Sequence, residues 1–400
     1  MSPALPANWD SVLVTAALDE DRPIIRPTVK TAARDYRETG AFPIVDQSQN
    51  AIAGWTDNAA AVLRPARPVV VFGDHTRAFK YVDFPFATGA DGTLVLNPSP
   101  EFEPHFFYFA CLGLEIPARG YNRHYTMLKE MAVPKPPLDE QRKIAAVLGK
   151  VQAAVAVEGD LVRVARELKQ AALRQLFTRG LRHEPQKQTA LGPVPESWAV
   201  VEAGSLCHFS SGGTPDRGNP AYWTGSTIPW VKTGEVNYRT ISEVEECITE
   251  LGLQNSAAKL LPAGTLVMAM YGQGVTRGRV ARLGIAATTN QACAAIAPRP
   301  DSGISTDFLY HFFEFNYEYL RSLGHGANQK NLNLEIIRQV SVPVPPEAEQ
   351  REIAALLATL DAKIAHHEAR QALLRELFRT LLHDLLTARR RVPESLALAP

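Results

Sequence analysis

The segment VPKPPLDEQRKIAAVL, residues 133–148, recurs as VPVPPEAEQREIAALL at residues 342–357. Eleven of the sixteen aligned positions are identical and no gap is needed. Internal repeats decide an architecture because each copy is expected to fold in the same way. The sequence therefore predicts two halves built on one plan, with the repeated segment at an equivalent place in each.

Each copy predicts the start of a long helix. Its prolines hold the chain extended and exclude helix immediately before them. Acidic residues follow, such as Asp139 in the first copy and Glu347 in the second, and negative charge in a first turn stabilises a helix through its dipole. We expect the first helix to run from about residue 138 to 178, with Gly180 as its stop. The second is expected to end near residue 387, followed by a frayed tail.

Apolar residues follow each start at alternating steps of four and three, which is the pattern of a coiled-coil seam. Polar residues interrupt the pattern in both copies. The seam positions are Ile144, Leu148, Val151, Val155, Glu158, Val162, Ala165, Lys169, Ala172 and Leu176, then Ile353, Leu357, Leu360, Ile364, His367, Gln371, Leu374, Phe378, Leu381 and Leu385. A helix of about 60 Å needs a partner for such a stripe, so we expect the two to pack antiparallel.

Composition excludes several classes of protein. The length of 400 residues suggests two or three domains. The formal net charge of zero argues mildly against nucleic-acid binding. No apolar run approaches the roughly 18 residues of a membrane helix, and the N-terminus resembles no secretory signal. The four cysteines are scattered, so we expect reduced thiols, a cytoplasmic location and no metal site.

The predicted organisation is α+β, with a pseudo-two-fold internal repeat. Short β-rich runs occur at 69–72 and 93–96 in the first half, and at 227–231, 265–270 and 292–297 in the second. Each half also contains an aromatic helix, near residues 101–112 and around Phe308. The predicted domains are 1–132, a central helix at 133–180, a linker at 181–198, a second domain at 199–341 and a C-terminal helix at 342–390.

Catalytic motifs are missing or unconvincing. There is no P-loop, and Gly272, Gly274 and Gly278 have the wrong spacing for a dinucleotide fingerprint. The nuclease-like E-x-K ending at Lys169 lies inside the long helix without an acidic partner. Adjacent histidines at 366 and 367 point about 100° apart on a helix, so they cannot chelate a metal as an i, i+4 pair does. We assign no catalytic residue and no metal ligand.

Polar and basic loops occur in both halves instead. The segment 74–80 (DHTRAFK) follows a strand, and the segment 273–279 (QGVTRGR) occupies a similar place in the second half. Arginine can recognise guanine with two hydrogen bonds, and asparagine or glutamine can recognise adenine. Any single residue of these loops could simply be solvated. Their occurrence in both halves favours recognition.

Taken together, these features resemble the specificity subunit of type I restriction-modification systems. The repeats at 133 and 342 carry most of the resemblance. The second half adds GGTP at 212–215, YW at 222–223 and IPWV at 228–231, which resemble the start of a target recognition domain. The first half resembles another subtype through FGDHT at 72–76, KYVDFPF at 80–86 and DG at 91–92, and it lacks the GGTP segment.

The resemblance implies two target recognition domains joined by a coiled coil, each recognising one half of a bipartite, asymmetric site in double-stranded DNA. It also implies that the helices act as a ruler and dock two methyltransferase subunits, with restriction subunits further out. S-adenosylmethionine is expected on the partner, with no cofactor on this chain and no membrane association. The predicted DNA contacts are His75, Arg77, Lys80, Tyr121, Asn122, Arg123, Thr214, Lys232, Gln273, Thr276, Arg277, Arg279, Gln329 and Lys330.

Two alternatives remain at this point. The chain could be a coiled-coil scaffold joining two protein-binding domains, without DNA. It could also be a nuclease or methyltransferase that acts alone. Sequence-selective retention of duplex DNA excludes the scaffold, and methyl transfer without a partner favours the enzyme.

Overall fold

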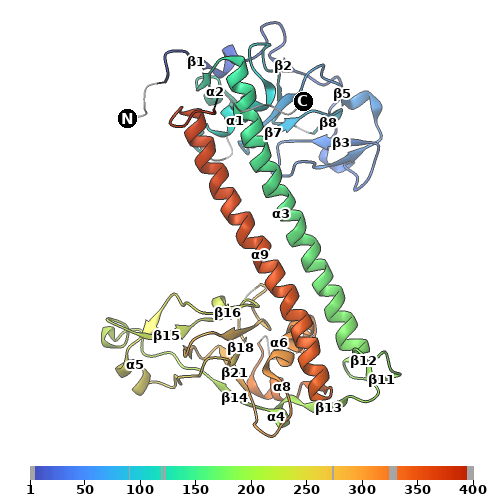
Figure 1. Cartoon of the computed structure of the whole chain (residues 1–400), viewed down its shortest axis with the longest axis vertical. Helices are drawn as coiled ribbons and strands as arrows, with labels where there is room; N and C mark the ends of the chain where they lie inside the picture. The colour runs from blue at the N-terminus through green and yellow to red at the C-terminus, as the bar shows by residue number, and fades with distance from the viewer. Residues whose placement is uncertain are drawn as a thin grey trace. The chain divides into compact units, whose positions relative to one another are not determined.

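The computed structural model describes residues 5–89, 91–118, 120, 123–272, 274–323 and 331–393. The chain divides into two compact units. Unit 1 comprises Met1–Asp160 with His367–Pro400, and unit 2 comprises Leu161–His366. Each long helix contributes one half to each unit (Figure 1).

Unit 1 contains two four-stranded sheets, with strand orders β2-β9-β6-β7 and β4-β3-β8-β5. Strand β6 is at the centre of the first sheet, and its four apolar residues are fully buried, as expected for a continuous apolar run. The elements are β1 Asp10–Leu13, β2 Ile24–Ile25, β3 Phe42–Val45, β4 Gly54–Thr56, β5 Val62–Leu63, β6 Val69–Gly73, β7 Phe79–Val82, β8 Phe86–Thr88, β9 Thr93–Leu96, α1 Pro104–Leu112, α2 Tyr125–Leu128 and β10 Ala132–Lys135.

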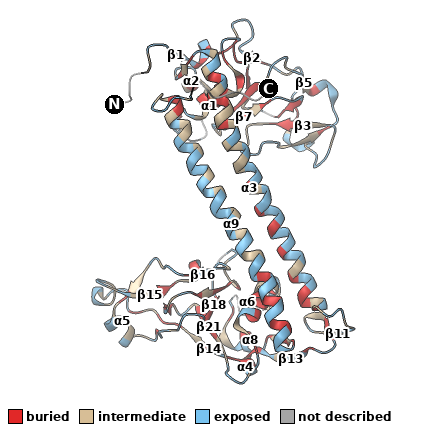
Figure 2. Ribbon diagram, in the orientation of Figure 1, coloured by how far each residue is buried: buried red, intermediate tan, exposed pale blue. Residues whose placement is uncertain are grey.

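Unit 2 contains a five-stranded sheet, β14-β21-β18-β19-β16, and a three-stranded sheet, β17-β15-β20. Figure 2 shows that the strands of both units are largely buried, whereas the long helices are exposed over much of their length. The elements are β11 Gln186–Thr189, β12 Gly192–Pro195, β13 Ala199–Glu202, α4 Ala203–Leu206, β14 Cys207–Ser211, β15 Ile228–Val231, β16 Thr240–Ile241, β17 Cys247–Ile248, α5 Glu250–Gln254, β18 Leu266–Ala269, β19 Val280–Leu283, β20 Thr288–Thr289, β21 Cys293–Pro298, α6 Thr306–Phe315, α7 Tyr317–Leu323, α8 Leu334–Arg338 and β22 Ser341–Val344.

The two units share one topology. The order β2-β9-β6-β7 in unit 1 corresponds to β14-β21-β18-β19 in unit 2. In each unit a parallel pair follows the same plan, β3 with β8 and β15 with β20. The strand before each long helix pairs with a strand near the start of its unit, β10 with β1 and β22 with β13. The mixed α/β fold with an internal repeat is therefore confirmed.

The long helices α3 (Leu138–Arg179) and α9 (Glu347–Leu386) match their predicted ranges closely. In unit 1, Gln371 donates to the carbonyl of Val155 at 3.2 Å, and Nδ1 of His367 lies 2.7 Å from Glu158 Oε2. Higher numbers in α9 meet lower numbers in α3, so the helices are antiparallel there. His367 is the counterpart of Glu158 in the repeat, 209 residues later. Two polar interruptions of the seam, Glu158 and His367, are thus paired with each other.

The recurring Glu-Gln of the repeat fixes each helix to its own unit. Gln141 Oε1 accepts from Glu103 N at 2.9 Å, and its Nε2 donates to two further carbonyls. Gln350 forms the same three bonds, accepting from Ser305 N at 2.8 Å. The preceding glutamate accepts from a tryptophan indole in both units, Trp9 in the first and Trp198 in the second. These two repeated residues therefore hold the start of each helix against the sheet-bearing part of its unit.

Two stretches differ from expectation. The predicted linker 181–198 contains an antiparallel hairpin, β11 with β12, that turns at Gly192 with a φ of 98°. Trp198, at its end, is fully buried. The proline-rich, polar composition did not predict this hairpin, because the burial of Trp198 comes from contacts with residues distant in the sequence. At the start of the expected frayed tail, Arg391 forms two hydrogen bonds with the carboxylate of Glu140, at 2.6 and 2.9 Å, and residues 394–400 lie outside the described residues.

Two other sequence-based expectations can be compared with the structure. The four cysteines are free thiols, three of them buried. Among the described residues, no helix has both the length and the apolar character needed to span a membrane.

Candidate nucleic-acid interface

In unit 1, the turn between β6 and β7 carries two of the predicted contacts, His75 and Arg77. Arg77 has a φ of 62°, and its amide donates to the carbonyl of Gly73 at 2.7 Å. The left-handed residue reverses the chain within a very short connection. The Arg77 guanidinium donates to the carbonyl of Ile116 at 2.8 Å, and the residue remains exposed overall. The turn therefore presents a basic side chain on a fixed backbone.

Gln47 holds this turn through two hydrogen bonds. The hydroxyl of Thr76 donates to the Gln47 carbonyl, and the amide of His75 donates to the Gln47 Oε1 at 3.4 Å. A Cβ at Gly73 would lie 2.2 Å from the Thr76 hydroxyl and 2.8 Å from the Gln47 carbonyl, so only glycine allows this approach. Gln47 is not among the contacts predicted from the sequence, because its position beside this turn depends on the fold.

Asp74 joins a second loop to the same turn. Its carbonyl accepts from the amide of His124 at 2.9 Å, and its carboxylate accepts from the amide of Tyr125 at 2.7 Å. The Nε of Arg123 lies 3.9 Å from the same carboxylate, with its side chain 77% exposed. Arg123 is therefore brought beside the turn. Tyr121 and Asn122 lie outside the described residues.

Lys80 does not fit its predicted role in DNA contact. Its ammonium donates to the carbonyl of Asp46 at 2.7 Å and lies 3.6 Å from the Asp46 carboxylate, and only 9% of the side chain is exposed. Burial lowers the pKa of Lys80, opposed by the charge of Asp46. The side chain of Lys80 points from β7 into the interior of unit 1. It therefore contacts Asp46, directly after β3, and does not face solvent.

In unit 2, the corresponding loop connects β18 with β19, residues 270–279. Two side chains of α7 hold it from one side. Tyr317 donates to the carbonyl of Val275 at 2.5 Å, and Arg321 donates to that of Gly274 at 2.7 Å. Arg277 donates in turn to the Arg321 carbonyl at 3.4 Å. Tyr317 and Arg321 are not among the residues predicted from the sequence, because a position in a helix does not indicate that a side chain contacts a distant loop.

The other predicted residues of this loop are also placed. Arg279 donates to Asn237 Oδ1 at 2.6 Å, and its guanidinium lies 5.9 Å from the ring centre of Tyr238. The carbonyl of Thr276 accepts from the Arg279 amide at 3.1 Å, which closes the loop. Gln273 lies outside the described residues. The loop thus gathers Thr276, Arg277 and Arg279 as predicted.

A second loop approaches this one, as it does in unit 1. The amide of Leu332 donates to the carbonyl of Met270 at 3.1 Å. This bond is the counterpart of the one between His124 and Asp74, because Met270 and Asp74 each follow the central strand of their sheet. Gln329 and Lys330, the contacts predicted just before Leu332, lie outside the described residues.

The GGTP segment forms the neighbouring part of the same sheet end. A Cβ at Gly212 would lie 2.0 Å from the carbonyl of Thr289, and one at Gly213 would lie 2.4 Å from the amide of Ala258, so both must be glycine. The indole of Trp230 donates to the Gly213 carbonyl at 2.9 Å. Thr214 follows, and its hydroxyl donates to Gln291 Oε1. Thr214 therefore lies at this sheet end, and its role in DNA contact stays a prediction.

Lys232 is neutralised by carboxylates. Its ammonium lies 2.7 Å from Glu245 Oε2 and 2.8 Å from Glu246 Oε1. These two hydrogen bonds raise the pKa of Lys232. Glu246 also pairs with Arg217, whose guanidinium lies 3.8 Å from the ring centre of Trp223. Lys232 thus belongs to an ion cluster, and the predicted DNA contact loses its support.

One group of side chains has the spacing of metal ligands: His311, Glu314 and Asp361 in unit 2. The ammonium of Lys169 lies 2.6 Å from Glu314 Oε1 and also pairs with Asp361. The lysine of the E-x-K segment therefore supplies the cation at this group, and the cluster joins α3, α6 and α9 within the unit. The same arrangement accounts for Lys169 at an apolar seam position.

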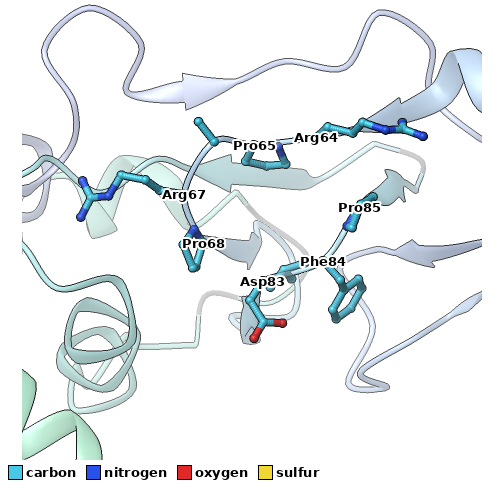
Figure 3. A pocket seen from close by; sticks show the side chains of 9 residues that line it. Arg64, Pro65, Arg67, Pro68, Asp83, Phe84 and Pro85 are labelled. Atoms are coloured by element: carbon cyan, nitrogen blue, oxygen red, sulfur yellow. The ribbon is translucent and has the colours of Figure 1, made fainter. Parts of the chain in front are cut away.

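A pocket in unit 1 lies away from the interface. It is lined by residues 64–68, before β6, and residues 82–85, after β7 (Figure 3). The turn with Arg77 connects the other ends of these two strands. Prolines, Phe84 and two arginines line the pocket, and Arg67 already donates to the carbonyl of Phe102 at 2.9 Å. Nothing in this lining adds to the interface.

Comparisons with known proteins agree with this architecture. Residues 195–376 match the family model described as type I restriction modification DNA specificity domain. The chain is 22% identical to the specificity subunit of the type I restriction enzyme EcoR124I/EcoR124II of Escherichia coli, over 82% of this chain and 81% of that one. It is 28% identical to the MjaIX specificity subunit of Methanocaldococcus jannaschii, over 48% of this chain and 44% of the relative.

A solved structure shares the fold of the whole chain. The S subunit of a type I restriction-modification system from M. genitalium superposes with a TM-score of 0.68, covering 96% of this chain and 99% of that one at 18% identity.

The two units share one topology, and each carries polar and basic side chains at one end of its sheet. The same two helices contribute one half to each unit. This arrangement defines a modular recognition protein. The matches indicate its kind. Residues 195–376 match the type I restriction modification DNA specificity domain, and the chain is similar over most of its length to a specificity subunit of a type I restriction enzyme.

Proposed function

We propose that each unit recognises one half of a bipartite, asymmetric site in double-stranded DNA. The observation that carries this proposal is the equivalence of two turns. The connection β6–β7 in unit 1 and the connection β18–β19 in unit 2 follow the same strand of one topology. Both carry arginines, and both are met by a second loop through a matching backbone bond. Arginine side chains on rigid turns suit contacts with base edges and phosphates.

The two sheet ends differ in detail, which supports recognition of different sequences. Unit 1 presents His75, Arg77 and Arg123 above Gln47. Unit 2 presents Thr214, Thr276, Arg277 and Arg279, with GGTP at the edge. Hydrogen-bond donors at different positions match different base sequences, so an asymmetric site follows from two unequal units.

The proposed partners follow from the similarity to specificity subunits of type I restriction enzymes. We propose that two methyltransferase subunits dock on the chain, that restriction subunits join the complex, and that S-adenosylmethionine binds to the methyltransferase, which modifies adenine. The neutral net charge of this chain is compatible with DNA binding if the partners supply much of the phosphate neutralisation that drives affinity. We also propose that the chain acts without catalytic residues of its own and in the cytoplasm.

The experiment that tests this function uses two matched variants, Arg77→Ala and Arg277→Ala, each in the complex with its methyltransferase. Each variant is expected to lose discrimination in one half-site only, by about 1–3 kcal/mol per lost base contact, and the affected halves should differ. Binding to duplexes mutated in either half gives the measurement. Equal loss in both halves for each variant contradicts separate recognition. Absence of any sequence-selective binding by the native complex contradicts the function itself.

A further inference from the structure

The structure places an unpredicted amide, Gln291, at the centre of the recognition edge of unit 2. Residue 291 precedes β21, which lies between β14 and β18 in the sheet. On one side, the amide of Gly213 donates to the carbonyl of Thr289 at 2.9 Å. On the other, the amide of Met270 donates to the carbonyl of Ala292 at 2.8 Å. Gln291 therefore lies between the GGTP segment and the arginine-bearing loop.

The backbone on both sides of Gln291 is fixed. The amide of Asn290 donates to the carbonyl of Val231 at 3.0 Å, and its side-chain Oδ1 accepts from the amide of Ala292 at 3.1 Å. This closed turn leaves the side chain of Gln291 exposed. An exposed glutamine on a rigid turn has little backbone entropy to lose on binding, which suits a specific contact.

The side chain itself is also oriented. The hydroxyl of Thr214 donates to Gln291 Oε1, and within the described part of the chain the Nε2 has no hydrogen-bond partner. The amide nitrogen therefore offers its donors to solvent, and the oxygen retains a second lone pair. One donor and one acceptor side by side match the N7 and N6 positions of adenine in the major groove.

We propose that Gln291 is a specificity-determining residue of unit 2 that contacts an adenine in its half-site, and that Thr214 positions it. This inference rests on the proposed function, because it assigns a base contact within the same DNA site. It gives a role to an amide outside the predicted contacts and explains why the threonine of GGTP faces the sheet edge.

The test compares Gln291→Ala, Gln291→Glu and Thr214→Ser in complexes of the full chain with its methyltransferase. Randomised duplexes provide the probe, with selection read by sequencing. Gln291→Ala should reduce the preference for adenine at one position of one half-site by roughly 10- to 100-fold. Gln291→Glu should disfavour adenine at that position, since a carboxylate offers acceptors only. Thr214→Ser retains the hydroxyl and should preserve the preference.

The outcomes separate the two proposals. A native preference retained at every position by Gln291→Ala, with the unit 2 half-site still selected, overturns the role of Gln291 and leaves the proposed function standing. A loss of selectivity at both halves overturns the role as well, because it indicates a general defect. Absence of selection by the native complex contradicts the proposed function. Unchanged thermal unfolding of Gln291→Ala serves as the control, as expected for an exposed side chain.

Discussion

At the residue scale, the predicted contacts differ in the groups with which their side chains pair. Arg77 lies on the β6–β7 turn and Arg123 on the loop beside it, whereas Thr276, Arg277 and Arg279 lie on the β18–β19 loop. Lys80 and Lys232 share the right neighbourhood, yet their ammonium groups are taken by protein oxygens. A sequence shows which residues are basic and near a loop. It does not show which way a lysine points or which acids meet it, because both depend on pairing across distant strands.

Lys80 gives the first prediction at this scale. Lys80→Met removes the partner of a largely buried Asp46, and an unpaired buried charge is costly, so unit 1 should lose about 3 kcal/mol of stability. Urea unfolding of the chain measures this loss. Lys30→Met is the control, since Lys30 pairs with an exposed Asp91, and it should change little. Full stability with weakened DNA binding in Lys80→Met would restore the contact originally predicted from sequence.

At the element scale, the seam of the long helices follows the predicted positions closely. Ile144 and Leu148 in unit 1, and Ile353 and Leu357 in unit 2, are buried as the four-three spacing requires. The starts of both helices could also be predicted, because prolines and acidic residues act on the backbone next to them in the sequence. The sequence did not show the role of the repeated Glu-Gln. The glutamine of each copy forms hydrogen bonds with backbone groups about 40 residues away. Recurrence marked those residues, but only the fold assigns them to the joint between helix and sheet.

The ion cluster of unit 2 predicts opposite pH dependences for its two carboxylates. Burial raises the pKa of Asp361. For Glu314, burial acts in the same direction, but the hydrogen bond from His311 and the charge of Lys169 outweigh it, so its pKa is lowered. The contribution of Glu314 to stability is therefore present above its ordinary value of 4.5 and is lost as pH falls. That of Asp361 is present below its ordinary value of 3.8 and is lost as pH rises.

Two substitutions of this cluster test these signs. The stability difference between native protein and Glu314→Gln should shrink as pH falls below about 4.5. The difference between native protein and Asp361→Asn should instead become less favourable to the native protein as pH rises above about 3.8. Chemical unfolding over a pH series measures both. Parallel trends for the two variants contradict the assignment of opposite shifts.

At the scale of the whole molecule, the central hypothesis is that the paired helices set the spacing of the two half-sites. Matched deletions of residues 155–161 and 364–370 remove one heptad from each helix and retain the seam register in both. Seven residues correspond to about 10 Å of helix, or roughly three base pairs. The gap between half-sites should change by about that amount, while the two recognised sequences stay the same. Selection from randomised duplexes measures it, and an unchanged gap contradicts the ruler.

The repeat was sufficient to predict the two-unit plan and the antiparallel helix pair, because both follow from local periodicity and duplication. The DNA target was beyond prediction. It depends on side-chain pairs such as Thr214 with Gln291, which only the sheet brings together, and on how readily the DNA deforms.

The most direct measurement is a base-resolution map of methylated adenines in a host carrying the complete system. The account predicts one asymmetric motif with two specified blocks separated by a gap of fixed length and unspecified sequence. A single continuous block, or methylation without sequence preference, would contradict it.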